Sequence, residues 1–214
     1  EGHRFPMLKY ELIFTQLLYE GLVENENFFK PNMVSPIILG LAHDQNYVEA
    51  VLNLKLDQKM IRRIGFPLSQ QLVDRELMLV KGTIDCCHHA FKYGISFNIA
   101  GGTHHAGRNF GEGFCLFNDQ AVAAAYLLAN KFVKRILIID LDVHQGNGTA
   151  HIFRENENVF TFSIHAEHNF PFIKEQSNRD VALADGVEDN EYLTVLKGQL
   201  DDIFDSFHPD FVFF

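Results

Sequence analysis

Hydrophobic residues along this chain follow two spacings, one typical of helices and one typical of buried strands. The helical spacing predicts helices over residues 7–22, 46–56, 69–93, 118–131 and 189–207, with Ser69 and Asn118 as suitable N-terminal caps. Short and nearly continuous apolar runs predict strands over residues 95–99, 135–141, 159–164 and 211–214. Because strands of this kind are buried on both faces, we expect a parallel sheet.

The alternation of strands and helices predicts an α/β fold, a three-layer open parallel sheet with helices on both faces. The chain has 214 residues, which is the size of one domain, so we expect residues 1–214 to form a single unit. Ligand sites in such sheets open at the carboxyl ends of the strands. The residues that directly follow each strand are therefore the candidates for chemistry.

Composition narrows the classes of partner. No stretch approaches twenty consecutive apolar residues and no export signal precedes the helices, so we expect a soluble, cytoplasmic protein with no membrane partner. Three cysteines, Cys86, Cys87 and Cys115, argue against a disulfide framework. The formal net charge of −10 disfavours direct nucleic-acid binding and favours a cationic peptide or amine.

Asp140, Asp142 and His144 directly follow a predicted strand. Side chains at i, i+2 and i+4 of an extended chain share a face, so two carboxylates and an imidazole converge on one spot, as in a divalent metal site. The alternative is a set of solvated turn residues that end a strand. Two glycines that follow allow a sharp turn into a helix and leave Asn147 near the same pocket.

His104 and His105 follow another predicted strand, within a glycine-rich segment. Neighbouring imidazoles reach one pocket only where the backbone is irregular, which the glycines permit. As a pair they are candidates for general base and general acid; the alternative is one core histidine and one exposed loop histidine. Asp140 and Asn147 are candidate acceptors that orient the two rings, and the histidine beside Asp140 should be the more readily protonated one.

Two further segments are predicted to reach the same edge of the sheet. Phe114 is a candidate lining residue of a narrow channel, opposite Phe170, or else a core residue. A nucleophilic role for Cys115 is rejected, because a lone cysteine is more often an inert apolar residue and a metal site makes a thiol nucleophile unnecessary. The roles of His165 and His168 stay open.

Together these motifs resemble those of the histone deacetylase superfamily, with the arginase/deacetylase fold, and most closely the branch of bacterial deacetylase-like proteins and class IV enzymes. The likeness covers the whole chain and rests on residues 3–7, 63–67, 101–107, 113–115, 140–148 and 186–189. It implies that His104 and His105 are catalytic and are oriented by Asp140 and Asn147. It further implies that Asp142 and His144 are zinc ligands and that Gly113, Phe114 and Phe170 form a tunnel for acyl-lysine. It also implies a structural potassium site, formed by Asp140, Asp142, His144, Ser163 and the carbonyl of Ile164.

The resemblance also implies that two functional groups lie beyond Phe214. These are the family's third zinc ligand, an aspartate, and its transition-state tyrosine, so the chain looks truncated at its C-terminal end. Because a catalytic zinc usually has three protein ligands and an open position, we expect the fragment to bind metal weakly and to be inactive, and the complete protein to be active. Iron(II) can replace zinc in a mixed carboxylate and imidazole site.

The predicted function is zinc-dependent hydrolysis of an acetyl or other acyl amide, in acetyl-lysine or an acetylated amine. Metal-activated water would attack, with the two histidines as acid and base. Two rival interpretations stay open, a dimanganese ureohydrolase of the arginase type and a non-catalytic acyl-lysine binding protein. The sequence does not identify the acylated substrate, the native metal or the oligomeric state.

Overall fold

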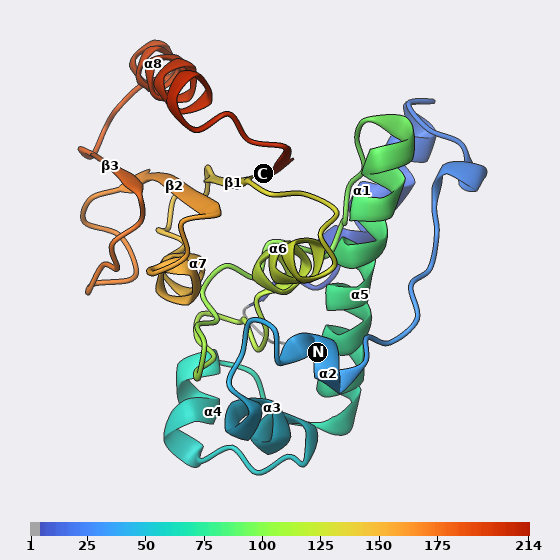
Figure 1. The fold of residues 1–214 in the computed structure, drawn as a ribbon. Coiled ribbons are helices and arrows are strands. Elements are labelled where there is room, and N and C mark those ends of the chain that lie inside the picture. Colours follow the sequence, from blue (N-terminus) through green and yellow to red (C-terminus); the bar gives the residue numbers. More distant parts are fainter. Residues whose placement is uncertain (1–4) are drawn as a thin grey trace.

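The computed structural model describes residues 5–214, so residues 3 and 4 of the first segment that carries the resemblance lie outside the described residues. Figure 1 shows the arrangement of the elements in this part of the chain. In order they are α1 (Lys9–Tyr19), the 3-10 helix η1 (Asn25–Asn27), α2 (Pro36–Leu39), α3 (Gln45–Leu52), α4 (Gln58–Ile64), α5 (Gln70–Tyr93), α6 (Asp119–Ala129), β1 (Ile136–Asp140), α7 (Asn147–Phe153), β2 (Val159–Ala166), β3 (Arg179–Leu183), α8 (Asp189–Phe207) and β4 (Phe211–Phe213).

The strands form one parallel sheet in the order β3-β2-β1-β4, which confirms the predicted α/β class. β1, β2 and β4 correspond to three of the predicted strands. The sequence pattern misses β3, because this strand starts with Arg179 and Asp180 and only alternate residues are partly buried. Asp140 at the end of β1 is in register with Ser163 of β2, so the residues that follow these strands meet at one edge of the sheet.

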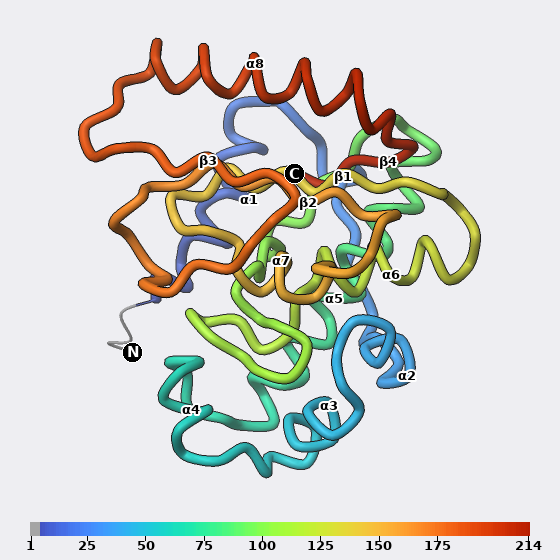
Figure 2. The backbone as a smooth tube through the Cα atoms, turned by 60° about the vertical axis from the view of Figure 1, so that its left-hand side comes forward, coloured from blue at the N-terminus to red at the C-terminus, as the bar shows by residue number. Residues whose placement is uncertain are grey.

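Helices cover both faces of the sheet and so complete three layers. Figure 2 shows α8 along one face, while α5, α6 and α7 lie on the other side of the strands. Leu137 and Ile139 of β1 point to the α8 side, where they pack in a core that includes Ile203. Ile136 and Ile138 point to the opposite side, into the larger core shared with the remaining helices. Alternate residues of one buried strand therefore serve two separate cores.

The five predicted helices are confirmed as α1, α3, α5, α6 and α8. The Oγ atom of Ser69 accepts a hydrogen bond from the Leu72 amide at 3.2 Å, and Oδ1 of Asn118 accepts one from the Ala121 amide at 2.9 Å, so both residues act as N-caps. The short elements α2, α4 and η1 have too few turns to leave a helical period in the sequence. No helix in the described part of the chain is long and apolar enough to cross a membrane.

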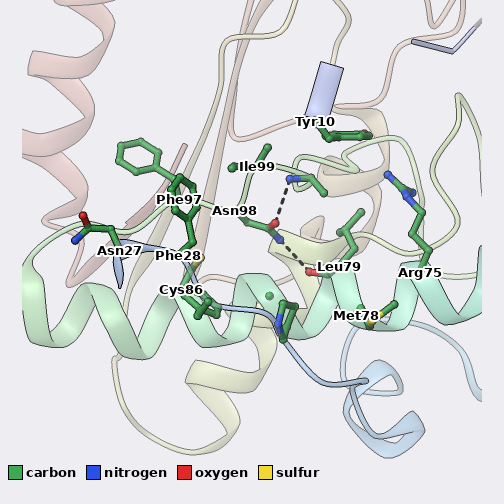
Figure 3. Close-up of a pocket in the computed structure, with 14 residues that line it drawn as sticks. Tyr10, Asn27, Phe28, Arg75, Met78, Leu79, Cys86, Phe97, Asn98 and Ile99 are labelled. Carbon is green, nitrogen blue, oxygen red and sulfur yellow. Dashed lines mark hydrogen bonds between the residues drawn. The ribbon is translucent and has the colours of Figure 1, made fainter. Parts of the chain in front are cut away.

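The predicted strand over residues 95–99 is wrong. This segment belongs to no strand of the described sheet, and the side chains of Ile95 and Phe97 are exposed. Asn98 turns toward α5 instead, where its side-chain amide donates to the Leu79 carbonyl at 2.9 Å and its Oδ1 accepts from the Ala100 amide at 3.2 Å (Figure 3). Side-chain bonds to a helix thus take the place of a strand ladder here.

Candidate active site

The first part of the site is the loop that follows β1. The Oδ1 atom of Asp140 accepts a hydrogen bond from the Asp142 amide at 3.1 Å, and Oδ1 of Asp142 accepts one from the His144 amide at 2.7 Å. These two turns place the three side chains at the carboxyl end of the sheet. The Oδ1 atom of Asp142 also lies 2.9 Å from Nδ1 of His144.

The start of α7 packs directly against the second part of the site, the loop with His104 and His105. The Thr149 amide donates a hydrogen bond to the His104 carbonyl at 3.1 Å. A Cβ atom on Gly148 would lie 2.4 Å from the Ala106 carbonyl oxygen, and one on Gly146 would lie 2.1 Å from an Asp140 carboxylate oxygen. Position 148 therefore requires glycine for close approach to the backbone of the histidine loop, and a side chain at position 146 would displace the Asp140 carboxylate.

The two imidazole rings lie side by side, with ring centroids 4.0 Å apart. The Nδ1 atom of His104 is 2.6 Å from Oδ2 of Asp140, and Nδ1 of His105 is 2.7 Å from Oδ1 of Asn147. The structure thus brings together the two loops that the sequence analysis singled out. Because each Nδ1 faces an acceptor, each ring directs Nε2 away from the acceptor that orients it.

Their different partners give the two histidines different basicity. Burial disfavours the imidazolium form of His104, but the charge and hydrogen bond of Asp140 outweigh burial and raise the pKa of His104 above 6.5. Burial and the neighbouring charge of His104 lower the pKa of His105 to about 4, since Asn147 offers a dipole and no charge. His104 is therefore the more readily protonated ring, whereas His105 stays neutral and keeps a lone pair.

Asp119, the first residue of α6, holds the backbone that carries the histidines. Its carboxylate accepts hydrogen bonds from the amides of Gly102 at 3.1 Å and Thr103 at 2.8 Å, and from the hydroxyls of Thr103 at 2.6 Å and Thr83 at 2.5 Å. Sequence reasoning missed this role. A carboxylate that follows a capping residue is ordinary at a helix start, and only its burial, invisible in the sequence, marks it as different.

His43 holds the other end of the same loop. The Nδ1 of this fully buried ring donates to the Gly107 carbonyl at 2.9 Å, and Nε2 accepts from the Asn118 amide at 3.0 Å. Two partners of opposite kind fix the neutral tautomer, and burial lowers the pKa of His43 to about 4. This histidine is a structural link between the segment before α3 and the start of α6.

A cavity of about 560 Å³ opens above the histidine pair. Gly113, Phe114 and Phe170 all line it, together with Asp142 and His144. The ring of Phe170 lies 5.0 Å from that of His105 and 6.1 Å from that of His144, measured between centroids. The ring of Phe114 packs on Phe5 and Phe66 at 5.2 and 5.1 Å. Aromatic rings thus form part of the wall around the two imidazoles.

Comparison with known proteins identifies the family. A family model described as the histone deacetylase domain matches residues 3–214. The chain belongs to this family. It is 44% identical over 214 residues to an uncharacterized protein of Picosynechococcus sp., covering 100% of this chain and 71% of that protein.

Two solved structures of histone deacetylase homologues share the fold. One, from Aquifex aeolicus, has a TM-score of 0.84 and 25% identity, over 99% of this chain and 63% of that one. The other, a homologue complexed with SAHA, has a TM-score of 0.81 and 26% identity, over 98% of this chain and 64% of that one. The chain therefore spans just under two thirds of the length of either solved homologue.

The deacetylase-family site contains two donors that fit a divalent metal. Asp142 offers a carboxylate and His144 an imidazole, and the two point at each other at the cavity wall. Within residues 5–214, no group of three or more His, Cys, Asp or Glu side chains has the geometry of a metal site. One carboxylate and one imidazole are thus available at this wall, whereas a catalytic zinc usually has three protein ligands.

The remaining candidates in the deacetylase-family chain have ordinary surroundings. Burial raises the pKa of the Cys115 thiol, so the unreactive form is favoured. His165 is buried, with Nδ1 3.0 Å from the Ser163 hydroxyl, whereas His168 is exposed beside Asp185. Ser163 and Ile164 lie on β2, and Ser163 is in register with Asp140 at the end of β1.

A second cavity of about 360 Å³, whose lining residues are drawn in Figure 3, shares part of its wall with the first. Tyr10, Arg75 and Ala100 line both cavities. The side chain of Asn98, bonded to α5, forms part of the wall of the second one. Phe97, Asn98 and Ile99, which belong to the segment predicted as a strand, therefore form part of the wall of the second cavity.

Proposed function

We propose that the protein containing this chain hydrolyses acetylated amines, with acetyl-lysine in a peptide or a small acetylated amine as substrate. The observation that supports it best is the histidine pair. Two adjacent imidazoles, one bonded to a carboxylate and one to an amide, share a cavity with the two metal donors Asp142 and His144. Family membership agrees with this chemistry.

The hydrogen bonds assign a proton role to each ring. His105 donates from Nδ1 to Asn147, so its neutral form carries a lone pair on Nε2 that accepts a proton from the attacking water. His104, whose pKa is raised by the charge and hydrogen bond of Asp140, is the better suited ring to carry the extra proton and to donate it from Nε2 to the leaving nitrogen when the C–N bond breaks. The products are acetate and the free amine, and the two rings exchange protonation states.

A divalent metal held by Asp142 and His144 would supply Lewis-acid stabilisation of the negative charge that develops on the carbonyl oxygen. Zinc is the metal we propose, with iron(II) as the alternative that the same oxygen and nitrogen donors accept. The residues around Asp140 and Ser163 are proposed to hold potassium. The aromatic wall of Phe114 and Phe170 is proposed to enclose the acyl chain and to exclude water from its sides.

The test is hydrolysis of an acetyl-lysine peptide by the full-length protein with zinc. Replacing His105 by Ala should reduce kcat by about 100-fold or more, because a general base is lost, while bound zinc measured by atomic absorption stays unchanged. The exposed His168 is the matched control, and H168A should retain wild-type turnover. Turnover retained in H105A would refute the assignment.

Urea release, metal content and peptide binding separate the rivals. A ureohydrolase would release urea and contain two manganese ions per chain, and a non-catalytic binding protein would bind the acetylated peptide without turnover, with or without a chelator. The match to the histone deacetylase domain favours the deacetylase interpretation over both.

A further inference from the structure

The orientation of His105 depends on a side-chain amide, and an amide can present either of its two ends. Asn147 turns its oxygen toward His105, and its Nδ2 donates to Oε2 of Glu112 at 2.9 Å. With the amide reversed, an NH₂ group would face Nδ1 of His105 and stabilise the tautomer that carries its proton on Nε2. A carboxylate at position 147 would have no such ambiguity.

Glu112 removes the ambiguity because an ionised carboxylate only accepts hydrogen bonds. Its other oxygen, Oε1, accepts from Nε of Arg63 at 2.7 Å. Burial opposes ionisation, but the bonds from Arg63 and Asn147 outweigh it and hold the pKa of Glu112 below its ordinary value. The group next to the Asn147 amide is therefore an anion, and it favours the NH₂ end on its own side.

The end of α4 fixes Glu112 in place. The amide of Gly113 donates to the Arg63 carbonyl at 3.2 Å, and that of Phe114 donates to the Ile64 carbonyl at 2.7 Å. The Arg63 guanidinium also lies over the ring of Phe110, 4.0 Å from its centroid. Two backbone bonds and one ion pair thus join the loop of Glu112 to the helix that supplies its cation.

We propose that Glu112 is a positioning residue that fixes the orientation of the Asn147 amide and, through it, the tautomer of His105. The chain of contacts runs from Arg63 through Glu112 and Asn147 to the ring that accepts the proton. Its catalytic consequence rests on the proposed function, whereas its effect on the tautomer of His105 does not.

The decisive experiment is nitrogen NMR of the histidine rings in the metal-free full-length protein at pH 8. We expect His105 as the Nδ1–H tautomer in the wild type and a population with the proton on Nε2 in Glu112→Ala. His43, whose tautomer is fixed by two backbone partners, is an internal reference and should not change. Glu175, a carboxylate paired with Arg154 elsewhere, provides the matched control E175Q. A pure Nδ1–H tautomer in E112A would overturn the proposal.

Kinetics of the zinc-loaded full-length protein give a second readout. E112A should lower kcat by at least about tenfold with KM within about twofold, as expected when an outer hydrogen-bond partner is lost. E112Q retains one acceptor oxygen and should recover part of kcat; equal kcat in E112A and the wild type would overturn the proposal. If E112A does not fold, Glu112→Leu, which also has no acceptor, takes its place under the same tautomer criterion. If the protein hydrolyses no acetylated amine at all, the function proposal fails while the NMR result still decides on Glu112.

Discussion

Replacing Asp119 tests whether one carboxylate holds the histidine loop. Four donors converge on it, two backbone amides and two hydroxyls. The hydroxyls of Thr83 and Thr103 rotate and find other partners, but the amides of Gly102 and Thr103 cannot. An amide bonded to a charged acceptor contributes about 1.5 to 3 kcal/mol. With two such amides, Asp119→Ala should lower the free energy of unfolding by about 3 to 6 kcal/mol, a large share of a typical domain's stability.

The measurement is urea unfolding of the full-length protein, followed by circular dichroism. Asp119→Asn keeps one acceptor oxygen, so it should lose about half as much as D119A. The control is Asp205→Asn, an exposed position on α8, which should change stability by less than about 0.5 kcal/mol. In a D119N variant that remains folded, the chemical shifts of the His104 and His105 rings should move. Wild-type stability in D119A would refute the view that this carboxylate anchors the loop.

Three further substitutions probe the surroundings of the site. Burial raises the pKa of Glu76 from 4.5 to about 7, so its charge costs about 3 kcal/mol above pH 7. Because the buried histidines are unchanged in Glu76→Gln, the difference in urea-unfolding free energy between the wild type and this variant isolates Glu76, and it should shift against the wild type as pH rises from about 4.5 to 7. The same pH dependence in both proteins would contradict this account. Gly148→Ala places a methyl group against the Ala106 carbonyl and should reduce turnover more than it reduces secondary structure, whereas unchanged turnover would show that the loop yields. His43→Leu leaves the Gly107 carbonyl and the Asn118 amide without partners and should lower the thermal midpoint by an amount equivalent to about 2 to 4 kcal/mol, and an unaltered midpoint would exclude the link.

Sequence patterns predicted the inner strands and the long helices. A strand buried on both faces is a continuous apolar run, and a helix buried along one side has apolar residues at helical spacing. The meeting of His104 with Asp140 was also predicted, although one premise was wrong. Residues 95–99 form no strand in the described sheet, yet the histidines reach its carboxyl edge. They do so because Asp119 and the start of α7 hold their loop, not because a strand delivers it.

The supporting residues were beyond sequence reasoning. His43, Glu112 and Asp119 act through partners far along the chain, such as Glu112 with Asn147 thirty-five residues away. Their residue types are common in loops and at helix ends, so composition gives no signal. The motif residues were recognisable because several donors stand close together in the sequence, whereas these three act singly.

The histidine loop is joined to β1 through Asp140, to α6 through Asp119 and to α7 through Thr149. No single element can therefore assemble it, and local fraying of any one helix leaves the other attachments intact. The amides of Gly102 and Thr103 are both bonded to the Asp119 carboxylate, so their exchange with deuterium would report how often the start of α6 separates from the histidine loop.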